Sequence, residues 1–345
     1  MDKLPLYDGS GSPRDWLLEN QINLSKYIDV NDCLDIDDKI VCRDFVDSNA
    51  IYKNLGIHIY QFLKVHDEWK LRVLKHHMAS WMSLDELTCI GSHQAITDFL
   101  QSLLEWRETL HLRKIVALDI DALCARLFNI IHTQSRYRAL SNLKDYKAQE
   151  MLNLMQNLLD CPTLAICFRN TFVGGLLRLS GKSGLVPEAL IRQDVTLEMG
   201  DAVAAGAFGE LYTGDFRGQA VAVKVFKFYQ NTDMATYLKA ISRETLIWRQ
   251  LFHPHVLPFI CVHYYSTNIH QRIGLVSPWM KHGNVQEFLR QFPDANRTSL
   301  ITDVAEGLFY LHSTHPIVTI VGEQPGGWHL NFSIKMKKPM YLPTP

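Results

Sequence analysis

The sequence predicts an α+β protein in which an all-helical region up to about residue 180 precedes a five-stranded antiparallel sheet with one main helix. Three observations predict this class. Apolar residues recur at three- and four-residue intervals through the first half of the chain, small flexible residues gather near 180–184, and the later pattern alternates as strands do. With 345 residues, 47% of them hydrophobic, the chain is long enough for two domains.

Charge and composition argue against several classes of partner. Lysine and arginine number 35 and aspartate and glutamate 36, so a net charge of -1 creates no field that would attract nucleic acid or an anionic membrane. No apolar run approaches the roughly 18 residues of a membrane helix, and no signal core follows residues 1–5. The seven cysteines form no CxxC pair, which indicates reduced thiols. We therefore expect a cytoplasmic protein that binds neither nucleic acid nor membrane.

Helical patterning covers residues 1–180 without a strand signal. Ser12 and the capping box that begins at Ser83 mark expected helix starts. Apolar stripes at 96–104 and 151–159 are interpreted as packing faces of a helical bundle, with a partner-binding groove as the alternative. The role of this region stays open, and a protein partner is its expected ligand.

Residues 181–194 are predicted to be a linker, because the small residues before Pro187 break the helical pattern. A P-loop interpretation of Gly181-Lys182-Ser183 fails because Leu176 stands where that motif needs its first glycine. The second domain is therefore expected to begin at residue 195.

The pattern after the linker is that of a sheet carrying one helix. A hairpin is expected from Leu211 to Val225 with its turn at Gly214–Gly218. A helix follows at 234–251, and further strands are expected at 256–262 and 273–277.

Strand alternation singles out Lys224. The valines at 221, 223 and 225 share one face of their strand, so Ala220, Ala222 and Lys224 share the other. The small neighbours leave space for a flat ligand beside Ala222, with an ammonium group at its far end. The alternative is an ordinary lysine at a sheet edge that extends to water.

Glu244 is the expected partner of Lys224. It falls in the middle of the apolar stripe of the predicted helix, three residues after Ile241 and four before Trp248. A carboxylate on a buried stripe is unfavourable unless it is paired, and Lys224 lies twenty residues earlier on the preceding strand. A glutamate at the rim of the stripe is the alternative.

A glycine run precedes the hairpin. Gly206 and Gly209 lack side chains, so their backbone amides could approach phosphate oxygens closely, and Phe208 could close over the loop. Such strings are common in turns, and it is the position between two strands that favours a phosphate-binding loop here.

Residues 195–318 resemble a protein kinase domain of the tyrosine-kinase-like group, a family of Ser/Thr and Tyr kinases. The matching motifs are Ala205-Gly206-Ala207-Phe208-Gly209-Glu210-Leu211, Ala220-Val221-Ala222-Val223-Lys224, Arg243-Glu244, His253-Pro254-His255-Val256-Leu257 and Leu275-Val276-Ser277-Pro278-Trp279-Met280. The departures are Ala204 for the first glycine of the loop, Leu211 for its valine and His255 for an asparagine.

The resemblance implies a small lobe of five antiparallel strands with a regulatory helix, followed by the first helices of the large lobe. It implies that Ser277 is the gatekeeper, that the Met280 backbone contacts adenine, and that Leu211 and Ala222 cover the ring. It also places Trp248 in the core stack of the kinase fold. The expected nucleotide-binding residues are Val203, Gly206, Phe208, Gly209, Leu211, Ala222, Lys224, Glu244, Ser277 and Met280.

The match stops at His315–Val318, and no aspartate follows Asp303. Phosphoryl transfer needs one carboxylate to orient the attacking hydroxyl and another to hold magnesium. We therefore expect no catalytic residues, no metal site, and weak ATP binding that depends little on magnesium. Residues 319–345 are expected to be a divergent, disordered tail.

Two interpretations of the whole chain follow. The first is a truncated, inactive kinase-like protein of a signalling pathway that retains an ATP cleft. The second is a non-enzymatic adaptor in which the helical region and a pseudokinase-like module only present surfaces to partners. The histidines at 253, 255, 263 and 270 have no metal-site spacing, so no zinc centre is expected.

Overall fold

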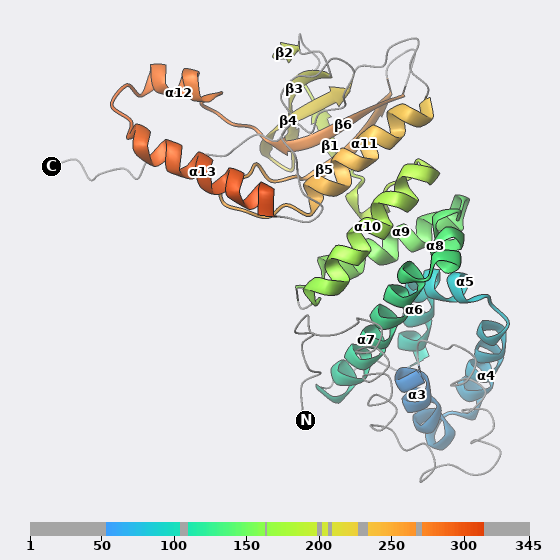
Figure 1. The fold of residues 1–345 in the computed structure, drawn as a ribbon. Coiled ribbons are helices and arrows are strands. Elements are labelled where there is room, and N and C mark those ends of the chain that lie inside the picture. The colour runs from blue at the N-terminus through green and yellow to red at the C-terminus, as the bar shows by residue number, and fades with distance from the viewer. Residues whose placement is uncertain are drawn as a thin grey trace. The chain divides into compact units, whose positions relative to one another are not determined.

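The fold is taken from a computed structural model, which describes residues 53–103, 110–162, 164–198, 202–205, 209–226, 234–266 and 271–313 (Figure 1). The predicted helix start at Ser12 and the tail at 319–345 lie outside these residues. The chain divides into two compact units, residues 1–175 and 176–345.

Helices alone make up the described part of the first unit. They are α3 (Lys53–His66), α4 (Glu68–Met82), α5 (Glu86–Gly91), α6 (His93–Leu103), α7 (Leu110–His132), α8 (Gln134–Ser141), α9 (Asp145–Asp160) and the start of α10 (Ile166–Ser183). The predicted packing faces are confirmed, because Ile96, Leu100, Met151 and Met155 are all fully buried or nearly so.

The expected capping box at Ser83 is wrong. Ser83 is the C-cap of α4, and its hydroxyl donates to Ser80 O at 2.6 Å. Asp85 caps α5 instead, because its carboxylate accepts from Thr88 N at 3.0 Å and from the Thr88 hydroxyl at 2.6 Å. Serine and aspartate both favour N-caps, and the Ser-x-x-Glu spacing alone does not distinguish Ser83 from Asp85.

The predicted linker is partly helical. Helix α10 continues through Ser183, and Gly184 follows it with a φ of +72°, a left-handed value that favours glycine. Residues 181–183 are therefore helix, contrary to prediction. The stretch after Gly184 contains a short 3₁₀ helix, η1 (Glu188–Leu190), and leads into the sheet.

The second unit is built on one antiparallel sheet, which confirms the predicted α+β class. Its strands are β1 (Val195–Leu197), β2 (Ala204–Ala205), β3 (Gly209–Phe216), β4 (Gln219–Phe226), β5 (Cys261–Ser266) and β6 (Gln271–Pro278). The order is β1-β3-β4-β6-β5, with β2 also paired to β3, so the sheet has one short strand more than predicted.

Two strand boundaries differ from prediction. The β3–β4 turn is tighter than expected, because Arg217 and Gly218 have φ values of 55° and 81° and residues 214–216 remain in β3. The strand predicted at 256–262 begins only at Cys261. The preceding residues form a turn in which Val256 N donates to His253 O at 3.1 Å.

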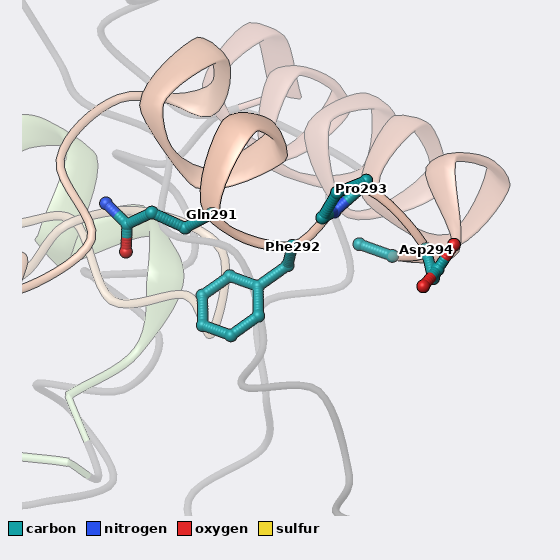
Figure 2. Close-up of a pocket in the computed structure, with 5 residues that line it drawn as sticks. Gln291, Phe292, Pro293 and Asp294 are labelled. Atoms are coloured by element: carbon teal, nitrogen blue, oxygen red, sulfur yellow. The ribbon is translucent and has the colours of Figure 1, made fainter.

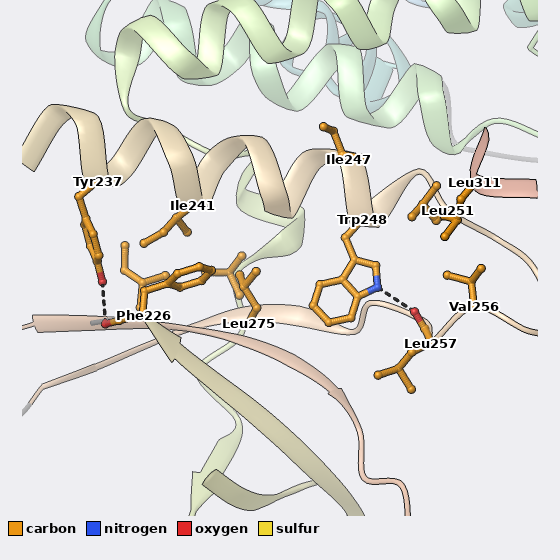
Figure 3. Packing of buried hydrophobic residues seen from close by; sticks show 12 residues of the cluster. Phe226, Tyr237, Ile241, Ile247, Trp248, Leu251, Val256, Leu257, Leu275 and Leu311 are labelled. Carbon is orange, nitrogen blue, oxygen red and sulfur yellow. Dashed lines mark hydrogen bonds between the residues drawn. The ribbon is translucent and has the colours of Figure 1, made fainter. Parts of the chain in front are cut away.

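Besides the end of α10 and η1, the described part of this unit contains the helices α11 (Met234–Arg249), α12 (Val285–Gln291) and α13 (Arg297–Ser313). Apolar side chains pack on both faces of the sheet. One cluster joins Val195 to the valines of β4, and the other lies between α11 and the sheet and includes Trp248 and Leu275 (Figure 3). Among the described helices, none has the length and apolarity needed to cross a membrane.

Replacing Asp85 with alanine should destabilise the first unit by about 1 kcal/mol, whereas Ser83→Ala should change its stability little. Hydrogen bonds from Thr88 lower the pKa of Asp85, with Lys147 adding to the effect. The stabilisation is therefore present above the usual carboxyl pKa and is lost as the pH falls through the lowered value. Urea unfolding of both variants at neutral pH measures the difference, and an equal loss in both would contradict Asp85 as the cap.

Candidate functional site

The centre of the candidate site is an ion pair between β4 and α11. Lys224 Nζ lies 2.6 Å from Glu244 Oε1. The two side chains are only 17% and 7% exposed, so the pair is shielded from water. Lys224 Nζ also lies 4.9 Å from the centre of the Phe226 ring, a distance typical of a cation–π contact. The pair expected from the helical stripe is thus present.

Burial raises the pKa of Glu244, and the charge of Lys224 and its hydrogen bond oppose that shift. Burial and the lysine thus have opposite effects on a carboxylate that is only 7% exposed to water. Its ionised form in the folded protein consequently depends on the ammonium group of Lys224.

Strand register brings four predicted residues to one face of the sheet. Leu211 on β3 pairs with Lys224 on β4, and Ala222 on β4 pairs with Ser277 on β6. Directly opposite residues in an antiparallel pair project to the same face. Ala222 and Ser277 are 8% and 5% exposed, so the side chains beside the lysine on this face are small and buried.

The other predicted nucleotide-binding residues divide into described and undescribed positions. Val203 is exposed, and its N–H donates to Leu211 O at 2.8 Å. Gly209 begins β3, where a Cβ atom would lie 2.5 Å from Val225 O, so a larger residue would collide with backbone. Met280 follows β6, and its carbonyl accepts from Gly283 N at 2.9 Å. Gly206 and Phe208 lie outside the described residues.

Trp248 holds α11 against the loop that precedes β5. Its indole Nε1 donates to Leu257 O at 2.7 Å (Figure 3). Its ring centre lies 5.8 Å from that of Phe259. The tryptophan lies one helical turn after Glu244, so its anchoring fixes the part of α11 that carries the carboxylate.

An anchor that sequence reasoning missed joins the same loop to α13. His255 Nε2 lies 3.0 Å from Glu306 Oε2 and 3.7 Å from Asp303 Oδ1. In addition, Phe252 N donates to the Tyr310 hydroxyl at 2.9 Å. The only signal in the sequence was the histidine in place of the family's asparagine, and nothing in the spacing connected it to two acidic residues about fifty positions later.

One hollow in the second unit lies away from this ion pair. It is lined by Gln291, Phe292, Pro293, Asp294 and Ala295, at the end of α12 (Figure 2). None of these residues belongs to the predicted nucleotide-binding set. The hollow is therefore separate from the predicted nucleotide-binding residues.

The described residues fit one half of a nucleotide–metal site. Lys224 supplies a shielded cation for phosphate, and the small side chain of Ala222 lies on the same face of the sheet. Over the described ranges, no cluster of three or more histidine, cysteine, aspartate or glutamate side chains could hold a metal ion. The carboxylate nearest the lysine, that of Glu244, is already engaged by it.

Replacing Lys224 with methionine should destabilise the second unit by about 3 kcal/mol at pH 8, because an uncompensated carboxylate would remain buried. The pKa of Glu244, already above its usual value, should rise further without the ammonium group. A raised carboxyl pKa means that stability falls as the pH rises through it, so the loss should be smaller near pH 5 than near pH 8.

The matched control is the double variant Lys224→Met/Glu244→Gln, which has no carboxylate to bury. Denaturant unfolding near pH 5 and near pH 8 should show a pH-dependent loss for the single variant and not for the double. The same loss at both pH values in the single variant would show that Glu244 does not depend on Lys224.

Comparison with known proteins places this site in a family. Residues 197–318 match the family model described as protein tyrosine and serine/threonine kinase. Curated relatives include the RasGEF domain-containing serine/threonine-protein kinase X of Dictyostelium discoideum, 30% identical over 123 residues, which are 34% of this chain and 12% of the relative. The dual specificity protein kinase shkC of the same organism is 30% identical over 135 residues, or 38% and 25% of the two chains.

A third relative, the cell surface receptor daf-1 of Caenorhabditis elegans, is 31% identical over 144 residues, which are 40% of this chain and 20% of the receptor. This chain thus covers between 12% and 25% of these three relatives. The matched region contains the whole of β2 to β6, α11 and the Lys224–Glu244 pair. Residues 197–318 thus match a protein kinase family model, and the sheet with α11 is consistent with a kinase small lobe.

Proposed function

We propose that the second unit binds adenine nucleotide in a cleft of the kinase type, in a cytoplasmic signalling protein of the tyrosine-kinase-like group. The observation that carries the proposal is the shielded ion pair, with Lys224 Nζ 2.6 Å from Glu244 Oε1. A lysine fixed by a carboxylate presents its ammonium group at a defined place, which is what the phosphates of a nucleotide need.

The face beside the lysine suits an adenine ring. Leu211, Ala222 and Ser277 lie on one side of the sheet through the register described above. Trp279 N donates to Ala220 O at 3.0 Å, so the segment after β6 continues along the start of β4. In this proposal the Met280 backbone contacts adenine, and Val203, Gly206, Phe208 and Gly209 enclose the ring and the phosphates.

We propose further that these 345 residues do not transfer a phosphoryl group. The sequence holds no aspartate after Asp303, and Glu306 is engaged by His255. A group to orient the attacking hydroxyl and a group to hold magnesium are both required for transfer. The small lobe alone supplies neither.

Calorimetric titration with ATP should show weak binding, with an affinity that changes little between magnesium and a chelator. Lys224→Met/Glu244→Gln is the matched control, because it removes the cation without leaving a buried charge. We expect its binding heat to be lost while its unfolding transition persists. Absence of binding by the folded wild-type chain at about millimolar ATP, corresponding to a binding free energy near -4 kcal/mol or weaker, would reject the nucleotide proposal.

Incubation of the purified chain with ATP, magnesium and a mixed peptide pool should give no phosphopeptides above background. Mass spectrometry is the measurement. Phosphorylation that persists in the wild type and disappears in Lys224→Met would contradict the inactive state. It would also imply that another chain donates the missing carboxylates.

A second candidate function, an adaptor role for the helical unit, is favoured by one observation. Val65 near the end of α3 and Trp69 near the start of α4 are 79% and 66% exposed. Large apolar side chains at a surface are a feature of protein-binding sites. If ATP neither binds nor raises the melting temperature, the adaptor alone accounts for the chain.

A further inference from the structure

The last part of helix α10 packs directly on α11, within the second unit. Leu177 packs against the apolar cluster that contains Ile247, Trp248 and Leu251. A Cβ atom at Gly181 would lie 3.6 Å from Lys239 Cγ, which is ordinary van der Waals contact, so α10 and the stem of that side chain are neighbours. Residues 176–183, part of which was predicted to be a linker, therefore form a helix–helix contact.

Burial of α11 extends beyond the side that faces the sheet. Ile241 and Trp248 point toward the sheet, and Ile247 points away from it (Figure 3). Ser242 and Thr245, which share a face at helical spacing, are 3% and 0% exposed. A helix enclosed on more than one side cannot move without disturbing more than one contact.

The stretch after α10 is fixed to the edge of the sheet. Ile191 forms a parallel bridge with Val262, and Arg192 N donates to Val262 O at 2.9 Å. His263 Nδ1 donates to Arg192 O at 2.9 Å. Val186 and Leu190 are buried at 5% and 3% exposure. The segment thus adds a strand-like edge to β5, which resists displacement through backbone hydrogen bonds.

A further ion pair ties the end of this stretch to the β3–β4 turn. Arg217 Nε lies 2.7 Å from Asp194 Oδ2. Both side chains are well exposed, so the ion pair contributes little to stability, although it links Asp194 to the turn. Residues 176–194 are consequently in contact with the sheet at one end and with α11 at the other.

We propose that residues 176–194, here called the brace, set the position of α11 and through it the nucleotide affinity of the Lys224 site. This inference rests on the proposed function. Glu244 lies on α11 between the contacts with the sheet, and a shift of the helix by a fraction of a turn would break its 2.6 Å contact with Lys224. The brace is a positioning element and does not itself touch the nucleotide.

Helix α10 begins at Ile166, before the boundary between the units, and it ends in the brace. The brace is therefore continuous with a helix that starts in the first unit.

Two substitutions in the full chain test the brace. Leu177→Ala removes its apolar contact, and Gly181→Trp places a large side chain between α10 and Lys239 of α11. Val195→Ala is the matched control, since it removes methyl groups from the cluster on the opposite face of the sheet. Hydrogen exchange over 234–249 and calorimetric ATP affinity are measured for all three variants, each checked for folding by circular dichroism.

Both brace variants should accelerate exchange in α11 and weaken ATP binding by about tenfold relative to Val195→Ala, a change equivalent to 1.4 kcal/mol. Should Leu177→Ala fail to fold, Leu177→Val with Gly181→Trp gives the same comparison. If hydrogen exchange in α11 is unchanged in the brace variants, or if Val195→Ala accelerates it equally, the brace does not position α11. If exchange in α11 is faster but the ATP affinity is unchanged, the brace does not control nucleotide binding at Lys224. Absence of ATP binding by the wild type rejects the proposed function, while exchange still tests the positioning role.

Discussion

The second unit depends on where α11 lies, because that helix carries a carboxylate into a place with almost no water. Glu244 can remain ionised there only while Lys224 faces it across the gap between helix and strand. The valines on the opposite face of β4 hold the strand, and Trp248 holds the helix. A pair of charges is therefore positioned by apolar packing on two elements, and neither charge would be stable in that place alone.

The Lys224–Glu244 pair could be predicted from periodicity, because alternation along a strand and apolar spacing along a helix both indicate which face a side chain lies on. Contacts between distant segments carry no such signal. The bond between His255 and Glu306 joins a loop to a helix about fifty residues later, and no local pattern connects them. The number of strands was also underestimated, since β2 has only two residues and is too short to alternate visibly.

Local errors had local causes. Ser83 and Asp85 are both good N-cap residues, and the choice was decided by the Thr88 amide and hydroxyl that face Asp85. Glycines near 181 were interpreted as chain breakers, although a helix that packs closely on a neighbour tolerates them. In both cases the sequence identified the correct place in the chain, and a tertiary contact decided what formed there. The roles of the nucleotide-binding residues remain predictions, as do the domain boundaries at 195 and 319.

Helix α13 has a consequence for how the protein behaves at high concentration. Ile301 and Phe309 on this helix are 69% and 75% exposed, and Phe252, whose amide bonds to Tyr310 on the same helix, is 93% exposed. Large apolar side chains in such numbers favour self-association and recognition by chaperones when nothing covers them. Among the described residues of the second unit, we therefore expect these three side chains to be the ones through which the chain associates with itself at high concentration.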